Sequence, residues 1–350
     1  MNSTDGERGL SLTECEGAAM NSTKDVQRIR YSFLRIMTGS DLSVRRLPLM
    51  EIRSINEGPM VWLTACAHGD EVGGVVIIQE IFKRLRKSPL LRGSVCAFPM
   101  MNPLGFELAS RNITPSMEDL NRSFPGNRAG SFAERIADLI FSTIIASNPA
   151  LVLDLHNDWR QSIPYALIDP YPGLSHIEAY ERAKTIGLKS GFVLISEHKD
   201  SPDSIGWERT LSGSLIKHGI PALTLELGES CVVNEENVRY GVSSIWNILA
   251  DKGMVNDEGE SSVFRLPLQF NDRILRYSHQ PVCPVSGIVR FSVKPGDVVR
   301  RGQTVARIYG VFGRLQATIP AQEKAIVLGI SDSSVAFPGV PIIAFGMLQA

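Results

Sequence analysis

Hydrophobic positions in the first two thirds of the chain alternate between strand-like runs and helix-like patterns. Short uninterrupted apolar runs predict strands that are buried on both faces. Apolar residues three and four positions apart predict amphipathic helices between them. The predicted strands are 31–36, 47–55, 60–67, 95–101, 151–155, 192–195 and 221–225, and the predicted helices are 72–85, 132–144, 177–189, 211–217 and 238–249. This alternation indicates an α/β fold with a mostly parallel or mixed sheet flanked by helices.

The pattern changes at about Val263, where helical periodicity ends and short β-like runs alternate with Gly and Pro. The run 287–308 is faintly repeated at 325–345, which predicts a small all-β domain with two similar halves. Residues 294–303 resemble the lipoyl/biotinyl-carrier family of barrel sandwiches, but the Asp-Lys-Ala or Met-Lys-Met tripeptide of the modified lysine is missing. We therefore expect this domain to cover an active site or to mediate assembly.

These patterns divide the chain into three parts. Residues 1–24 are polar and without periodicity, which predicts a disordered tail. An α/β domain is expected at 25–258, followed by the small β-domain at 259–350. Asn234 and Gly253 are predicted to cap the last long helix.

Composition narrows the class of partner. The formal net charge of −1 over 350 residues gives no electrostatic footprint for nucleic acid or an anionic membrane. The chain has no apolar run long enough to span a bilayer, and its N-terminus lacks the features of a signal peptide. Five scattered cysteines without a Cys-x-x-Cys pair are typical of reduced thiols in a cytoplasmic protein. Self-association into a homo-oligomer stays open.

A histidine and a glutamate stand at the end of the third predicted strand. His68 follows the apolar run 60–67, and Glu71 is expected in the first turn of the next helix. An imidazole and a carboxylate three residues apart across such a turn can reach one point, and both are zinc donors. Ligands of open α/β sheets bind beyond the carboxyl ends of the strands. The alternative for this short motif is a glutamate favoured by the helix dipole beside a histidine without a metal.

Two further reactive side chains, His156 and Glu226, stand where other predicted strands stop. Zinc held by two histidines and one glutamate keeps a position open for water, lowers the pKa of that water and polarises a carbonyl. Such a site also needs a general base, an oxyanion donor and a substrate anchor. The sequence offers a candidate for each: Glu226 as the base, Arg111 at the oxyanion, and Arg122 beside Asn121 for a substrate carboxylate.

Several motifs follow one another in an order that resembles a known family. They are His68-Gly-Asp-Glu71, Asn102-Pro103 followed by Arg111, Asp119-Leu-Asn-Arg-Ser-Phe-Pro-Gly126, Asp154-Leu-His156 and Leu225-Glu-Leu-Gly228. Together they resemble the succinylglutamate desuccinylase/aspartoacylase family of the zinc-carboxypeptidase-like group, over about residues 45 to 250. The β-domain and the run from Asn121 to Gly126 look closer to its bacterial N-acetyl-diaminobutyrate deacetylase branch.

The resemblance implies a cofactor and a reaction. It implies one zinc ion per chain, held by His68, Glu71 and His156. The implied reaction is hydrolysis of the amide bond of an N-acyl amino acid to a carboxylate and a free amine.

The resemblance also implies roles for five other residues. Glu226 would be the general base and proton shuttle, and Arg111 would lie at the oxyanion. Asn121 and Arg122 would bind the substrate carboxylate. Asp119 would accept a hydrogen bond from a zinc-binding histidine.

Other interpretations remain open at this point. The same residues would serve a zinc carboxypeptidase that acts on small peptides. A non-catalytic metal-binding scaffold is disfavoured by Glu226, since zinc binding needs no general base. Asp158 and Trp159 are open to a structural or a substrate-binding role, with Asp158 a candidate contact for a cationic substrate. The remaining histidines, His176, His198, His218 and His279, are interpreted as surface or packed residues.

Overall fold

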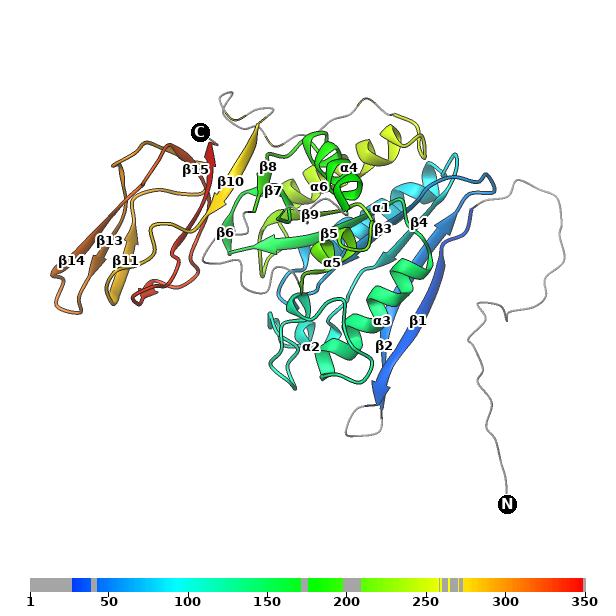
Figure 1. The fold of residues 1–350 in the computed structure, drawn as a ribbon, viewed down its shortest axis with the longest axis horizontal. Coiled ribbons are helices and arrows are strands. Elements are labelled where there is room, and N and C mark those ends of the chain that lie inside the picture. The colour runs from blue at the N-terminus through cyan, green and yellow to red at the C-terminus, as the bar shows by residue number, and fades with distance from the viewer. Residues whose placement is uncertain are drawn as a thin grey trace, which may run out of the picture.

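A computed structural model describes residues 27–38, 43–170, 176–197, 209–257, 259, 264, 270 and 273–348. The predicted tail 1–24 and His198 lie outside the described residues. Figure 1 shows an α/β part, in blue to yellow, beside a smaller all-β part, in orange to red. The α/β prediction and the predicted C-terminal β-domain are both confirmed.

The α/β part is built on a mixed sheet with the strand order β1-β2-β4-β3-β5-β9-β7-β8. Neighbours among β4, β3, β5 and β9 are parallel, whereas β7 runs antiparallel to β9. The strands are β1 Arg30–Thr38, β2 Val44–Arg53, β3 Met60–Ala65, β4 Ser94–Phe98, β5 Leu151–Asp158, β7 Pro164–Ile168, β8 Leu194–Ser196 and β9 Ala222–Glu229, with the short β6 Gln161–Ser162 beside them.

Helices cover both faces of this sheet. On one face Gly241 of α6 lies against Ile77 of α1 and Leu227 of β9, where a Cβ atom would come within 2.4 Å of Ile77. On the opposite face, Ser212 of α5 accepts a hydrogen bond from Thr224 of β9. The helices are α1 Gly73–Lys87, α2 Pro103–Phe106, the 3-10 turn η1 Leu120–Arg122, α3 Phe132–Ala146, α4 Ile177–Leu188, α5 Leu211–Ile216 and α6 Glu235–Asp251. Among the described residues, none of the helices has the length and apolarity to cross a bilayer.

The predicted N-cap of α6, Asn234, is confirmed, whereas the C-cap is Lys252 and the predicted Gly253 is the residue after it. The side chain of Asn234 accepts hydrogen bonds from the backbone N–H groups of Glu236 and Asn237, which satisfies two free donors of the first turn. At the other end Gly253 has a φ of +64°, a conformation that glycine adopts without a steric cost.

Three local predictions at the site need correction. Glu71 lies before α1, whose N-cap is Val72, and is therefore not in the first helical turn. β5 and β9 do not stop at His156 and Glu226 but continue to Asp158 and Glu229, since polar residues there still pair. The strands β6 and β7 were missed, because their short run mixes Pro, Ser and Tyr with apolar residues.

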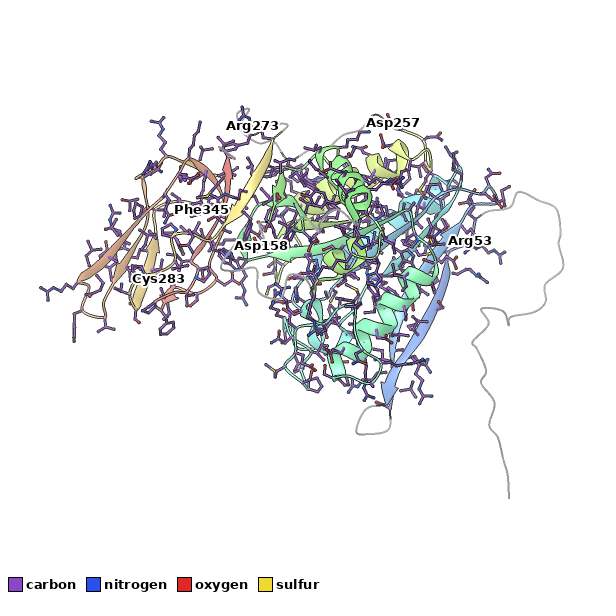
Figure 2. All side chains as sticks on the ribbon, in the orientation of Figure 1. Arg53, Asp158, Asp257, Arg273, Cys283 and Phe345 are labelled. Carbon is purple, nitrogen blue, oxygen red and sulfur yellow. The ribbon has the colours of Figure 1, made fainter. Side chains whose placement is uncertain are left out.

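The C-terminal part shows the predicted twofold repetition. One set of strands has the order β14-β13-β11-β16, and the other has the equivalent order β10-β17-β15-β12. The core between them contains Val289, Ile308 and Phe345. Figure 2 labels Phe345, which belongs to β17. The strands are β10 Ile274–Ser278, β11 Gly287–Phe291, β12 Val298–Val299, β13 Thr304–Tyr309, β14 Leu315–Pro320, β15 Ala325–Ile330, β16 Val335–Ala336 and β17 Ile343–Leu348.

Two strand pairings join the α/β sheet to the β10-β17-β15-β12 strands of the C-terminal part, while β14-β13-β11-β16 stays a separate sheet. β10 pairs in parallel with β8, and β15 pairs with β6, where Gly329 lies opposite Ser162. Because backbone hydrogen bonds fix this junction, loops of the β-domain are held next to the end of β5.

Candidate active site

Three predicted metal ligands meet at the carboxyl end of the sheet. His68 Nδ1 lies 2.6 Å from Glu71 Oε1, and His156 Nδ1 lies 2.7 Å from Glu71 Oε2. All three side chains are buried, and their donor atoms lie within 4.8 Å of one another. β3 leads to His68 and Glu71, while the neighbouring strand β5 carries His156.

Two further carboxylates, those of Asp119 and Asp154, lie at the Nε2 atoms of the two histidines. His68 Nε2 lies 3.1 Å from Asp119 Oδ1. His156 Nε2 lies 3.0 Å from Asp154 Oδ2. A neutral imidazole carries one N–H, so an Nε2 that donates outward leaves the Nδ1 lone pair facing an oxygen of Glu71. The Nδ1 lone pairs and the Glu71 oxygens repel one another at these distances. A divalent cation between them would turn this repulsion into attraction and would offset the negative charges of Glu71, Asp119 and Asp154. The donor set therefore fits a metal ion.

The electrostatics of the group agree with a ligand role for Glu71. Burial alone would raise the pKa of Glu71, but the adjacent His68 and His156 outweigh burial and lower it well below its ordinary value. Burial would lower the pKa of His156, but Asp154 and Glu71 outweigh that effect and raise it. Glu71 is therefore ionised at neutral pH, as metal binding requires.

Asp119 ties the polar loop after β4 to the histidine cluster. Its Oδ2 accepts hydrogen bonds from Arg111 Nε at 3.2 Å and Nη2 at 3.0 Å. Its Oδ1, which faces His68, also accepts from the backbone N–H of Asn121 at 2.8 Å. Arg111 Nη1 lies 3.6 Å from Glu71 Oε1. The guanidinium of Arg111 is therefore fixed at the edge of the cluster.

Asn121 and Arg122 lie close to the ring of His156 and line the same cavity. Asn121 Nδ2 lies 3.3 Å from His156 Nε2, and Asn121 Oδ1 accepts from the backbone N–H of Leu211 at 2.9 Å. Arg122 Nη1 donates to the carbonyl of Asn121 at 2.9 Å. The turn η1 thus presents an amide and a guanidinium to one cavity.

Glu226 stands opposite His156 on the adjacent strand. The two residues are paired in the register of β5 and β9, so their side chains project to the same face. Glu226 Oε2 is buried and has no hydrogen-bond partner among the described residues. Burial raises the pKa of Glu226 well above its ordinary value. A buried carboxylate without a partner is expected where a proton acceptor faces substrate or water.

These groups surround one cavity of 530 Å³. Seven of the eight predicted site residues line it, and the eighth, Asp119, lies behind His68. The lining residues from the prediction are His68, Glu71, Arg111, Asn121, Arg122, His156 and Glu226.

The β-domain forms part of the cavity wall. His279, interpreted from sequence as a surface or packed residue, lines the cavity, and its ring stacks on Trp159 with centroids 5.7 Å apart. Tyr277 Oη lies 2.8 Å from His279 Nε2. The backbone N–H of Arg160 donates to Asp332 Oδ1 at 2.7 Å, which fixes the β-domain loop at the rim. The β-domain therefore contributes residues to the wall of this cavity.

Asp158 lies where β5 reaches this wall, and Figure 2 labels it close to the C-terminal strands. Its Oδ2 accepts a hydrogen bond from Tyr165 Oη at 2.9 Å. Tyr165 is paired with Glu226 in the register of β7 and β9. Asp158 is thus engaged by the protein itself on the side of the cavity that faces the β-domain.

The model of the succinylglutamate desuccinylase/aspartoacylase catalytic domain matches residues 57–251, more than half of the 350-residue chain. The chain belongs to this family. As a member of the desuccinylase/aspartoacylase family it is a hydrolase that removes acyl groups from small molecules by cleaving amide bonds. Both the predicted family and the predicted enzyme class are confirmed.

One relative in sequence and two solved structures are similar to this chain. An N-alpha-acetyl-L-2,4-diaminobutyric acid deacetylase from Halomonas elongata is 29% identical over 299 residues, which are 80% of each chain. The structure of a succinylglutamate desuccinylase/aspartoacylase from Rhodobacter sphaeroides has a TM-score of 0.76 at 20% identity, covering 94% of this chain and 99% of that one. The product-bound ectoine utilization protein EutE from Ruegeria pomeroyi has a TM-score of 0.75 at 20% identity, covering 92% and 96%. The two structures show that the fold is shared.

Asp154 stands two residues before His156 in β5, and this spacing on a strand places both side chains on one face. That spacing in Asp154-Leu-His156 is the sequence signal for a contact between the two residues. Its carboxylate is fully buried between His156 and Thr64, whose Oγ1 donates to Asp154 Oδ1 at 2.6 Å. Asp154 therefore orients the ring of His156.

Asn157 carries no comparable signal, because its partners come from distant segments. Its backbone N–H donates to Glu71 Oε2 at 3.1 Å, and its Oδ1 accepts from the N–H of Gly73 at 3.1 Å. Its Nδ2 donates to the carbonyl of Glu229 at 3.0 Å. Asn157 thus links Glu71, the start of α1 and the end of β9.

Asp154→Asn should weaken metal binding. The amide keeps the shape and one acceptor but loses the charge that makes His156 a better ligand, so metal affinity should fall by about 10- to 100-fold. Competition with a chromophoric chelator measures this change. Asp138→Asn on α3 removes a carboxylate outside this cluster and is the matched control. Equal metal affinity in Asp154→Asn and the control would show that Asp154 only packs.

Proposed function

We propose that this family member is a zinc-dependent deacylase that cleaves the amide bond of an N-acyl amino acid. The observation that supports this most directly is the meeting of His68, Glu71 and His156 in one cavity with the unpartnered Oε2 of Glu226. The products are a carboxylate and a free amine. The relative from Halomonas elongata is named for an acetylated diamino acid, which belongs to the proposed substrate class.

Zinc is the metal that this donor set suits best. Two imidazole nitrogens and one carboxylate are a common set at catalytic zinc sites, which keep a coordination position open. His68, Glu71 and His156 would hold one ion per chain. Bound zinc would supply Lewis acidity toward the substrate carbonyl and toward water.

Glu226 is assigned the proton transfers. Its Oε2 accepts a proton from the attacking water, and the same carboxyl then gives that proton to the nitrogen of the leaving amine. Burial raises the pKa of Glu226 well above its ordinary value, which makes its carboxylate a stronger proton acceptor than an exposed glutamate.

Two arginines are assigned to the charges of the substrate. Arg111, which Asp119 holds by two hydrogen bonds, donates to the oxygen that becomes negative when water adds to the carbonyl. Arg122 binds the carboxylate of the amino acid through its planar guanidinium, with Asn121 beside it.

A zinc assay followed by a substrate panel tests the proposal. The purified protein should contain about one zinc per chain and should hydrolyse N-acetyl amino acids. Faster cleavage of dipeptides than of N-acetyl amino acids would favour the carboxypeptidase alternative. Stoichiometric zinc without hydrolysis across a broad acyl panel would favour the metal-binding scaffold.

Arg122→Lys should raise KM strongly. Lysine keeps the positive charge but loses the two-pronged geometry, and a charged hydrogen bond of this kind is worth about 1.5–3 kcal/mol. We expect kcat/KM to fall on the order of 10- to 100-fold, with most of the change in KM. Arg128→Lys, in the loop before α3, is the control. If substrate amides without the carboxylate are cleaved as fast as free acids, Arg122 has no binding role and a broader amidase is indicated.

The remaining assignments are part of the same proposal. We propose a hydrolase domain at 25–258 and a β-domain at 259–350 that closes the site. A cytoplasmic location and self-association stay predictions, which cell fractionation and gel filtration would test.

A further inference from the structure

The hairpin between β13 and β14 ends in a turn that presents two apolar side chains to water. Val311 is 83% exposed and Phe312 is 98% exposed. Backbone hydrogen bonds fix this turn: the N–H of Gly310 donates to the carbonyl of Arg314 at 2.9 Å, and the N–H of Gly313 donates to the carbonyl of Gly310 at 2.9 Å. A phenylalanine that a fixed turn holds in water is a typical anchor for a partner surface.

A row of apolar side chains continues from this turn across the four-stranded sheet. Ile288 of β11 pairs with Tyr309 of β13 and with Val335 of β16. Tyr309 also pairs with Leu315 of β14. Directly paired side chains lie on one face of a sheet, and Ile288, Leu315 and Val335 are 46%, 51% and 52% exposed, so this face is the outer one. We call the turn and this row the tip surface, which consists of Ile288, Tyr309, Val311, Phe312, Leu315 and Val335.

Arginines border the tip surface. Arg290 and Arg307 are cross-strand partners in the next row of the same face, and Arg314 follows the turn. Among the described residues, none of these three arginines forms an ion pair with a carboxylate. Residues 287–320 contain six basic residues and one acidic residue, a net charge of +5 in a chain whose formal net charge is −1. The tip surface therefore suits a partner that is both apolar and acidic.

The loop between β9 and α6 has this complementary character. Val232 is 53% exposed and Val233 is 43% exposed. Glu235 and Glu236 follow in the exposed first turn of α6. Residues 229–238 contain three acidic residues and no basic one, and Arg239 lies further along α6. We call Val232, Val233, Glu235 and Glu236 the acceptor surface.

One chain cannot bring its own two surfaces together. Figure 1 shows β13 and β14 on the side of the β-domain that faces away from the α/β part, to which α6 belongs. The pairing of β8 with β10 and of β6 with β15 fixes the β-domain in this place. The tip surface can therefore meet an acceptor surface only on another copy of the chain.

We propose that a second copy of this chain binds the tip surface through its acceptor surface, so that the protein self-associates in solution. Phe312 of one copy packs against Val232 and Val233 of the next, and Arg314 pairs with Glu235 across the contact. Because the two surfaces differ, the contact is heterologous and joins copies into a closed ring or an open filament. Assembly is one of the two tasks expected of the β-domain from its sequence.

Sedimentation velocity over a range of protein concentrations tests this contact. The wild type should sediment as a species larger than one chain. Phe312→Ser should raise the dissociation constant of self-association by about 10-fold or more, because it removes the central aromatic side chain. Ile55→Ser is the control, since it removes an apolar side chain that is 82% exposed outside both surfaces, and it should associate like the wild type.

A charge exchange tests which surfaces meet. Arg314→Glu and Glu235→Arg should each weaken association by about 10-fold, because each places like charges across the contact. The double variant should recover most of the association, since it restores the ion pair with its charges reversed. Arg128→Glu combined with Glu235→Arg should recover none, because Arg128 lies in the loop before α3.

Several results would overturn the proposal. One is a wild type that stays monomeric at every concentration up to its solubility limit. Others are association that Phe312→Ser leaves unchanged, and a double charge variant that associates as weakly as the two single ones. Monomers that co-sediment with phosphatidylglycerol vesicles through Phe312 would show that the tip surface binds lipid instead. Sedimentation measures mass and not catalysis, so each result is independent of the proposed function.

Discussion

Glu226→Gln is expected to lower kcat by a factor of about one hundred or more. Glutamine keeps the size of the side chain and its place opposite His156, but it cannot accept the proton of water at neutral pH. Zinc content should stay at the wild-type level, since Glu226 is not one of the proposed ligands. Stopped assays for kcat, together with metal analysis of the same preparation, measure both quantities.

The control for this variant lies on the same strand. Glu229 faces Asn234 and Asn237 outside the cavity, so Glu229→Gln should keep kcat. In the wild type, kcat/KM should decrease as the pH falls through the raised pKa of Glu226, because the protonated carboxyl is no base. That acid limb should disappear in Glu226→Gln. A kcat close to wild type in Glu226→Gln would place the base elsewhere in the cavity.

His156→Ala is expected to remove most of the bound zinc and with it the activity. Two remaining ligands, His68 and Glu71, hold zinc poorly, and the loss of the imidazole also leaves Asp154 buried without its partner. Elemental analysis after gel filtration measures zinc per chain. His176→Ala, at the start of α4 and outside the cluster, should keep its metal.

Full zinc occupancy in His156→Ala would contradict the ligand assignment, whatever its effect on activity. Because the variant also disturbs a buried hydrogen bond, its fold should be compared with the wild type by circular dichroism. His156→Gln, which fills the same space with a weaker ligand, is a second variant that should also lose zinc.

Local patterns in the sequence determined the order of strands and helices. Apolar runs and helical spacing depend on short stretches of chain, so β3, α1, α3 and α4 were predicted close to their observed bounds. The residues of the site were recognised for a related reason. His68 and Glu71 follow β3, and His156 and Glu226 lie near the carboxyl ends of β5 and β9. Each is an ionisable residue at or just after the end of an apolar run, which the sequence alone shows.

The ends of the elements were predicted less well than the elements themselves. β5 and β9 continue past His156 and Glu226 because each strand is paired with the other, and pairing between distant segments leaves no periodic signal in either one. The same reason explains why β7 was missed. Its place beside β9 depends on antiparallel pairing, and its composition alone does not predict it.

Only the tertiary structure decided what surrounds the reactive groups. Asn157 holds Glu71 and the end of β9 through bonds that span more than seventy residues, and no spacing rule predicts such contacts. His279 reaches the cavity because β10 pairs with β8, which brings the β-domain to the rim. Asp169 and Glu197 line the same cavity because their strands are neighbours in the sheet. The sequence determined which chemistry the chain carries, whereas long-range strand pairing decided which charges face the substrate.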